Sequence, residues 1–175
     1  MLERMHVFVD ETKNRGYLIA AAAVLLPDVA GVRRTVTELC KPGQRRIHFT
    51  KEKDARRRQI ITALAATDVR VEIYDASACH DRLARARCLE AITEDLAGRG
   101  RVRLVLERDD SVLAHDKRVL FDHVRKTGAR ELEYLFLRAH EECLLSIPDA
   151  VAWCWAKGGN WRTAVRPMVD RVHRL

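Results

Sequence analysis

Six carboxylates occur where strands and helices could bring them to one edge of a sheet. They are Asp10 and Glu11, then Glu107, Asp109 and Asp110, and finally Asp149. The first pair follows the apolar residues 5–9, the second group ends the apolar residues 102–107, and the last lies in the first turn of a predicted late helix. In α/β proteins, sites form outside the carboxyl ends of the strands. If the two strands are neighbours and parallel, their acidic ends meet.

Clustered carboxylates of this kind favour a metal ion. They repel one another, and they stay ionised together most easily when a divalent cation lies between them. Hard oxygen ligands suit Mg²⁺ or Mn²⁺, and such ions can activate water and stabilise the leaving oxygen in phosphodiester cleavage. The acids therefore predict a metal-dependent nuclease. We take Asp10, Glu107 and Asp149 as the metal ligands, with Asp109 and Asp110 as alternatives to Glu107.

Each acid also has a purely structural interpretation. An aspartate in the first turn of a helix, such as Asp149, complements the helix dipole without a metal, and acids at strand ends are often only turn residues. Neighbouring residues of a strand point to opposite faces. Only one of Asp10 and Glu11 can therefore join the site unless the chain turns there. We expect Asp10 to be the direct ligand and Glu11 to support it.

His48 is the candidate for proton transfer or phosphate contact. It ends a brief strand predicted at residues 46–49, just before a helix, although a partly buried histidine with a backbone partner fits equally. The arginines at 56–58 form a solvated helix face unless they flank the acids, where they would contact phosphate. Trp153 and Trp155 fit core packing, whereas Trp161 is better placed to stack on a base.

The bulk composition bounds the class of protein. The chain has 175 residues, which fits a single domain over residues 1–175, and 47% of them are hydrophobic and 33% charged. The net charge of +7 favours nucleic acid as a partner, although a basic surface alone would give the same number. Phosphate-binding glycine loops and the Gly-x-Ser-x-Gly motif are absent, so nucleotide-cofactor enzymes and serine hydrolases are unsupported.

The sequence also predicts a cytoplasmic location. Residues 1–11 carry charges where a signal peptide needs an apolar core. The longest apolar run, residues 17–27, is too short to span a bilayer. The five cysteines lack Cys-x-x-Cys spacing, which argues against zinc and favours reduced thiols. We therefore expect a soluble protein without membrane contact; its oligomeric state is open.

Two apolar patterns alternate along the chain, which indicates an α/β fold. Strands are predicted at residues 5–9, 17–26, 46–49, 70–74, 102–107 and 132–137. Helices are predicted at residues 27–40, 50–66 with Thr50 as the cap, 79–97, 116–126 and 148–156. The first two strands are expected to form a hairpin. The last sixteen residues hold few signals.

Four short motifs resemble a bacterial family, domain-of-unknown-function family 3800. Residues 7–12 (Val-Phe-Val-Asp-Glu-Thr) resemble its Asp-Glu-Ser opening, with Thr12 in place of serine. Residues 47–49, 104–107 and 144–153 resemble its histidine-bearing strand end, its central strand ending in an acid and its late aspartate-bearing helix. The resemblance spans roughly residues 5–156. It implies an RNase H-like fold, a mixed sheet with helices on both faces, and metal-dependent attack on a phosphodiester.

Two other functions fit the same sequence. A non-catalytic module for binding nucleic acid or protein would keep the fold, bind in a salt-dependent manner and ignore metal. An accessory protein of a defence or mobile-element system would act through a partner. Fold analogy alone does not establish activity.

Overall fold

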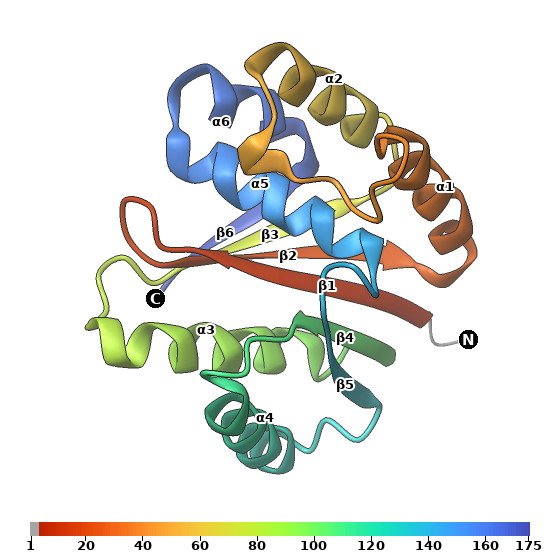
Figure 1. Ribbon diagram of the computed structural model, residues 1–175. Helices are drawn as coiled ribbons and strands as arrows, with labels where there is room; N and C mark the ends of the chain where they lie inside the picture. The colour runs from red at the N-terminus through yellow and green to blue at the C-terminus, as the bar shows by residue number, and fades with distance from the viewer. Residues whose placement is uncertain (1–3) are drawn as a thin grey trace.

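A six-stranded mixed sheet forms the centre of the computed structural model, which describes residues 4–175 (Figure 1). Its strands are β1 (Arg4–Thr12), β2 (Leu18–Leu25), β3 (Arg70–Asp75), β4 (Arg101–Glu107), β5 (Leu132–Leu137) and β6 (Val169–Arg174). Their order across the sheet is β5-β4-β1-β2-β3-β6. Strand β1 pairs antiparallel with β2 and parallel with β4. The predicted hairpin is confirmed, and the parallel pairing on which the predicted site depends is present.

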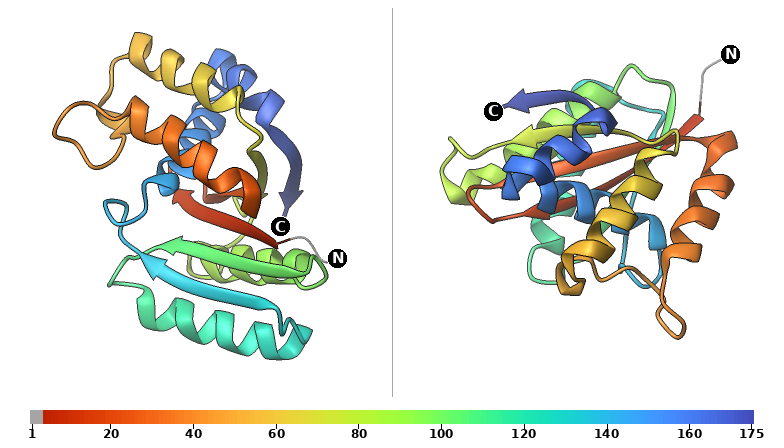
Figure 2. Two further views of the ribbon diagram at one scale, coloured as in Figure 1. Left: turned by 90° about the vertical axis from the view of Figure 1, so that its right-hand side faces the viewer. Right: turned by 90° about the horizontal axis from the view of Figure 1, so that it is seen from above.

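Helices cover both faces of the sheet, as Figures 1 and 2 show. They are α1 (Val29–Leu39), α2 (Asp54–Ala65), α3 (Asp81–Leu96), α4 (Leu113–Thr127), α5 (Ser146–Lys157) and α6 (Gly159–Val165). Helices α1, α2, α5 and α6 lie on one side, and α3 and α4 on the other. We call these the α5 face and the α3 face. The predicted α/β architecture with helices on both faces is confirmed.

The alternation of side chains along β1 assigns each of its residues to a face. Phe8 belongs to the core cluster on the α5 face, whereas Val7 and Val9 belong to the cluster on the α3 face. Because successive side chains of a strand point to opposite faces, Asp10 lies on the α5 face and Glu11 on the α3 face. Asp10 and Glu11 are the third-last and second-last residues of β1, so neither is a turn residue.

The brief strand predicted at residues 46–49 is wrong. Ile47 and Phe49 are buried in the α5-face core, and Phe49 packs edge-on against Trp153 with ring centroids 5.5 Å apart. The alternating burial that resembled a strand therefore comes from packing onto α5, without a neighbouring strand. A 3₁₀ turn, Phe49–Lys51, follows, and α2 begins at Asp54, so Thr50 is not its cap.

The last part of the chain holds more structure than its sequence predicts. Helix α6 and strand β6 both lie in the last seventeen residues, and β6 pairs parallel with β3. Strand β6 lies at the edge of the sheet, and its sequence Val-Asp-Arg-Val-His-Arg carries only two apolar residues. Half-exposed edge strands need little apolar surface, and so they give a weak signal.

Candidate functional site

Asp10 and Glu107 lie side by side at the carboxyl ends of two parallel strands. The register pairs Val9 of β1 with Leu106 of β4, so the next residue of each strand is one of these acids. Val105 belongs to the α5-face core, so Glu107, two residues later, points to the same face as Asp10. The two carboxyl groups are close enough for a side-chain hydrogen bond between them.

Asp149 reaches the same place from the opposite direction. Helix α5 lies across β1 and β2 (Figure 1), with Ile147, Ala150 and Val151 fully buried beneath it. Asp149 occupies its first turn. Burial, together with repulsion from Glu107, raises the pKa of Asp149 to about 6.

Glu107 lies close enough to both aspartates to affect their ionisation. Burial raises the pKa of Asp10 well above its usual range, and the charges of Glu107 and Asp149 raise it further, while Arg85 opposes them. Repulsion of this kind is what a divalent cation relieves, and the oxygen donors are those that Mg²⁺ or Mn²⁺ prefers. The donor chemistry suits such an ion, whereas the oxygens of the three acids do not all lie within 4.8 Å of one another.

A cavity of about 520 Å³ opens at the ends of these strands. Asp10 and Glu107 line it, and it extends to Glu11 and Arg85 on the α3 face. Asp149 is not part of this lining; it flanks the two strand acids from the α5 side. The strand ends are therefore accessible to a ligand from the α3 side and backed by α5 on the other.

Asp109 and Asp110 have partners of their own. Asp110 is exposed and binds Arg108 at 2.7 Å and Arg138 at 2.8 Å, which lowers its pKa. Asp109 accepts hydrogen bonds from the backbone N–H and hydroxyl of Ser111 at 2.9 and 2.6 Å, which lowers its pKa too. Both line the cavity. Glu107 is the acid of this group that adjoins Asp10.

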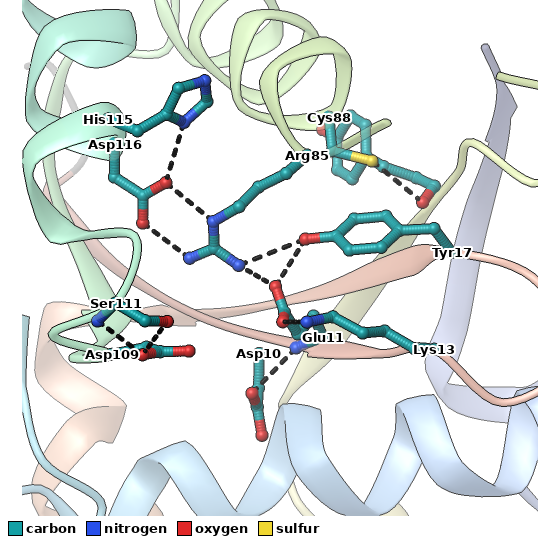
Figure 3. Close-up of polar contacts among 11 residues, drawn as sticks. Asp10, Glu11, Lys13, Tyr17, Arg85, Cys88, Asp109, Ser111, His115 and Asp116 are labelled. Atoms are coloured by element: carbon teal, nitrogen blue, oxygen red, sulfur yellow. Dashed lines mark hydrogen bonds and ion pairs between the residues drawn. The ribbon is translucent and has the colours of Figure 1, made fainter. Parts of the chain in front are cut away.

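Glu11 lies in a separate polar network on the α3 face (Figure 3). Its carboxylate accepts a hydrogen bond from the Tyr17 hydroxyl and pairs with Arg85, and Lys13 lies 3.3 Å away. Arg85 also binds the buried Asp116 through two nitrogens, at 2.7 and 2.6 Å. The sequence alone did not single out Arg85 and Asp116, because one arginine among several on a polar helix shows no distinguishing pattern.

His48 lies in the irregular segment before the 3₁₀ turn. Burial and the nearby charges of Arg46 and Lys51 lower its pKa. Arg46, two residues earlier, lies close enough to Asp149 to lower its pKa. His48 is not part of the lining of the cavity at the strand ends in residues 4–175.

A second cluster of acidic side chains lies on the α3 face, and the sequence alone did not reveal it. Within residues 4–175, Glu72, Asp95 and His173 form the group whose ligand atoms all lie within 4.8 Å of one another, a spacing compatible with a metal ion. Asp10, Glu107 and Asp149 are more widely spaced. Other residues already partner the cluster: Arg99 binds Glu72 at 2.9 Å, and Tyr74 donates to Asp95 at 2.8 Å. His173 bonds Glu72 at 2.6 Å, which ties β6 to β3.

The arginines at 56–58 act mainly within the fold. Arg57 donates to the backbone carbonyls of Phe49 and Thr50 at 3.0 and 2.6 Å, and its guanidinium lies 4.4 Å from the ring centre of Trp153. Arg58 lies 5.2 Å from that of Trp161. These contacts join α2 to α5 and α6, and the aromatic rings here are already covered by cations.

Each helix in residues 4–175 is too short or too polar to cross a membrane.

Comparison with known proteins identifies the fold. No family model matches the chain, and no curated protein matches it. A solved structure does: RNase HII, in the structure of the PCNA:RNase HII complex from Archaeoglobus fulgidus, superposes with a TM-score of 0.54 and 15% identity, over 85% of this chain and 69% of that chain. At this identity the likeness concerns the fold alone. The chain has an RNase H-like fold.

Proposed function

We propose that this chain is a metal-dependent nuclease that hydrolyses phosphodiester bonds in RNA or DNA. One observation carries the proposal: Asp10 of β1 and Asp149 of α5 are buried beside Glu107 of β4, and burial, followed by the neighbouring carboxylates, raises the pKa of both. Buried carboxylates that repel one another lower the stability of the fold. Carboxyl groups with raised pKa values beside a cavity are typical of functional sites. The RNase H-like fold is compatible with this chemistry.

In this proposal Asp10, Glu107 and Asp149 hold Mg²⁺ or Mn²⁺. The bound ion supplies a Lewis acid that activates water and stabilises the leaving oxygen. Glu107 and Asp149 both disfavour the ionised form of Asp10 without a cation. Glu11 supports Asp10 from the next position of the strand. His48 serves as a phosphate or proton contact outside the group of acids.

The basic residues of the cavity margin hold the substrate backbone. Arg108 and Arg138 are about half exposed and flank Asp110, which keeps both guanidinium groups beside the cavity. These two cations lie at the margin of a cavity whose other charged lining residues are mostly acids, and the whole chain carries +7, which favours a polyanion. We place the activity in the cytoplasm, where the five free thiols of the chain would stay reduced.

We also propose that the chain belongs to domain-of-unknown-function family 3800. The order and spacing of the four motifs support this, and β1, β4 and α5 are the elements that carry three of them. The proposal predicts that the structure of a member of that family has the strand order β5-β4-β1-β2-β3-β6. A member with another order would contradict it.

The test is cleavage of labelled single-stranded RNA, single-stranded DNA, duplex DNA and an RNA–DNA hybrid with and without Mg²⁺ or Mn²⁺. We expect at least one substrate to be cut only with the metal, and Asp10→Asn to reduce the rate by about 100-fold or more. Asp122→Asn, an exposed acid on α4, is the matched control and should retain activity. Salt-sensitive binding without cleavage would contradict the nuclease and favour the non-catalytic module.

A further inference from the structure

The two adjacent acids of β1 meet very different surroundings. Figure 3 shows Asp10 pointing toward helix α5 and Glu11 pointing toward Arg85 on the opposite face. Both oxygens of Glu11 are partnered: one contacts the Tyr17 hydroxyl and Arg85, and the other lies 3.3 Å from Lys13. Two cations and a hydroxyl already neutralise the carboxylate of Glu11, which makes it a weak ligand for a metal ion.

Arg85 is itself firmly held. It donates to both oxygens of Asp116, at 2.7 and 2.6 Å, and to the Tyr17 hydroxyl at 3.1 Å. The side chain of Asp116 is 1% exposed and that of Arg85 14%, so neither can turn to solvent without leaving a buried charge behind. A paired, bidentate guanidinium also has a fixed orientation. Arg85 is therefore a permanent cation at the α3 side of the cavity.

Its position decides how many metal ions the cavity can hold. The cavity reaches from Asp10 and Glu107 across to Glu11 and Arg85. A second divalent cation on the α3 side would need Glu11 as a ligand and would lie beside the guanidinium, which repels it. Asp109, the next acid of the lining, is already bound to Ser111.

We propose that Arg85 takes the place of a second metal ion, so that the site binds one divalent cation, held by Asp10, Glu107 and Asp149. This inference rests on the proposed metal site. Arg85 lines the cavity, but each of its side-chain nitrogens already has a partner within the protein. It is a positioning residue that holds Glu11 on the α3 face and supplies the positive charge there.

The number of bound ions is the direct test. Mn²⁺ is titrated into the full chain, with free ion counted by electron paramagnetic resonance and heat measured by calorimetry. We expect one ion per chain. Asp10→Asn should weaken binding by about 100-fold or more, whereas the adjacent isosteric change Glu11→Gln should keep one ion and weaken it by less than about fivefold. Asp122→Asn should match the wild type.

The outcomes separate the two proposals. Because Glu72, Asp95 and His173 have a spacing compatible with an ion of their own, the count is repeated in Glu72→Gln. Two ions in both proteins, or a loss after Glu11→Gln as large as that after Asp10→Asn, would overturn the role of Arg85 while leaving the metal site in place. No binding at all would overturn the metal site, and the inference with it.

A second variant tests Arg85 itself. Arg85→Met alone would leave Asp116 buried without a partner, so it is combined with Asp116→Asn, which removes that charge. This double variant frees Glu11, and we expect it to bind a second Mn²⁺ more weakly than the first. A folded double variant that still binds one ion, with unchanged affinity, would show that Arg85 does not exclude the second.

Discussion

Replacing Asp149 by asparagine should stabilise the fold in the absence of divalent cations. The pKa of Asp149 rises from an ordinary 3.8 to about 6 because the carboxyl is buried and faces Glu107. A carboxyl whose pKa is higher in the folded chain stabilises the fold fully below its unfolded pKa. That contribution is lost as the pH rises through about 6. At neutral pH the ionised form therefore costs stability, and asparagine does not ionise.

The size of the effect follows from the pKa. A rise of about two pH units, at about 1.36 kcal/mol per unit, corresponds to about 3 kcal/mol. Asparagine keeps the shape of the side chain but not all of its hydrogen bonds, so about 3 kcal/mol is the upper limit. For a chain of this length, 1 kcal/mol shifts the melting temperature by about 2–4 °C. The variant should melt up to about 10 °C higher than the wild type.

Urea denaturation in a chelator, from about pH 3 to about pH 8, measures the difference in the free energy of unfolding. The gap between Asp149→Asn and the wild type should widen with pH and nearly vanish at the acid end. Millimolar Mg²⁺ should reverse the order, because it stabilises only the chain that binds it. Asp122→Asn should show neither effect. Equal stabilities at all pH values, or a variant that is less stable throughout, would refute the reasoning.

Three further changes test the account. Glu107→Gln should abolish stabilisation by Mg²⁺ in a thermal melt. Asp110→Asn should retain that stabilisation, because Asp110 is exposed and already paired with arginines. Equal loss in both variants would contradict the choice of Glu107. Arg85→Met should lower the free energy of unfolding by about 3–5 kcal/mol, because it leaves Asp116 buried without its partner. Adding Asp116→Asn should recover much of that loss. Urea melts of the single and double variants measure both effects, and no recovery in the double variant would contradict this prediction. Mn²⁺ affinity should fall steeply as the pH drops through about 6, where Asp149 takes up a proton that competes with the ion; calorimetry across that range measures this, and pH-independent affinity would contradict it.

The sheet was predictable wherever burial left a strong pattern in the sequence. Strand β5 was predicted with its bounds, and β4 nearly so, because short, continuous apolar runs between turn residues are typical of buried strands. Helices at 79–97 and 116–126 were found at nearly the right places. Leu83 and Phe121 fit the apolar spacing of these helices but are 57% and 52% exposed. Spacing on a helix identifies a face, but packing decides how much of it is covered.

The site was predictable in part. Strand alternation assigned Asp10 and Glu11 to opposite faces, and parallel pairing of β1 with β4 brought Glu107 to Asp10. The partners of Glu11 could not be predicted, because Arg85 and Asp116 are separated from it by long stretches of chain and sit in polar sequence. The cluster of Glu72, Asp95 and His173 depends on β6, an edge strand with too few apolar residues to be recognised.

The most direct test of the central claim is a crystal structure with Mn²⁺, in which anomalous scattering locates the ion. We predict one strong anomalous peak per chain, within about 2.5 Å of carboxylate oxygens of Asp10, Glu107 and Asp149. Glu11 should remain bound to Arg85. A peak at Glu72, Asp95 and His173 with none at the strand ends would contradict the account.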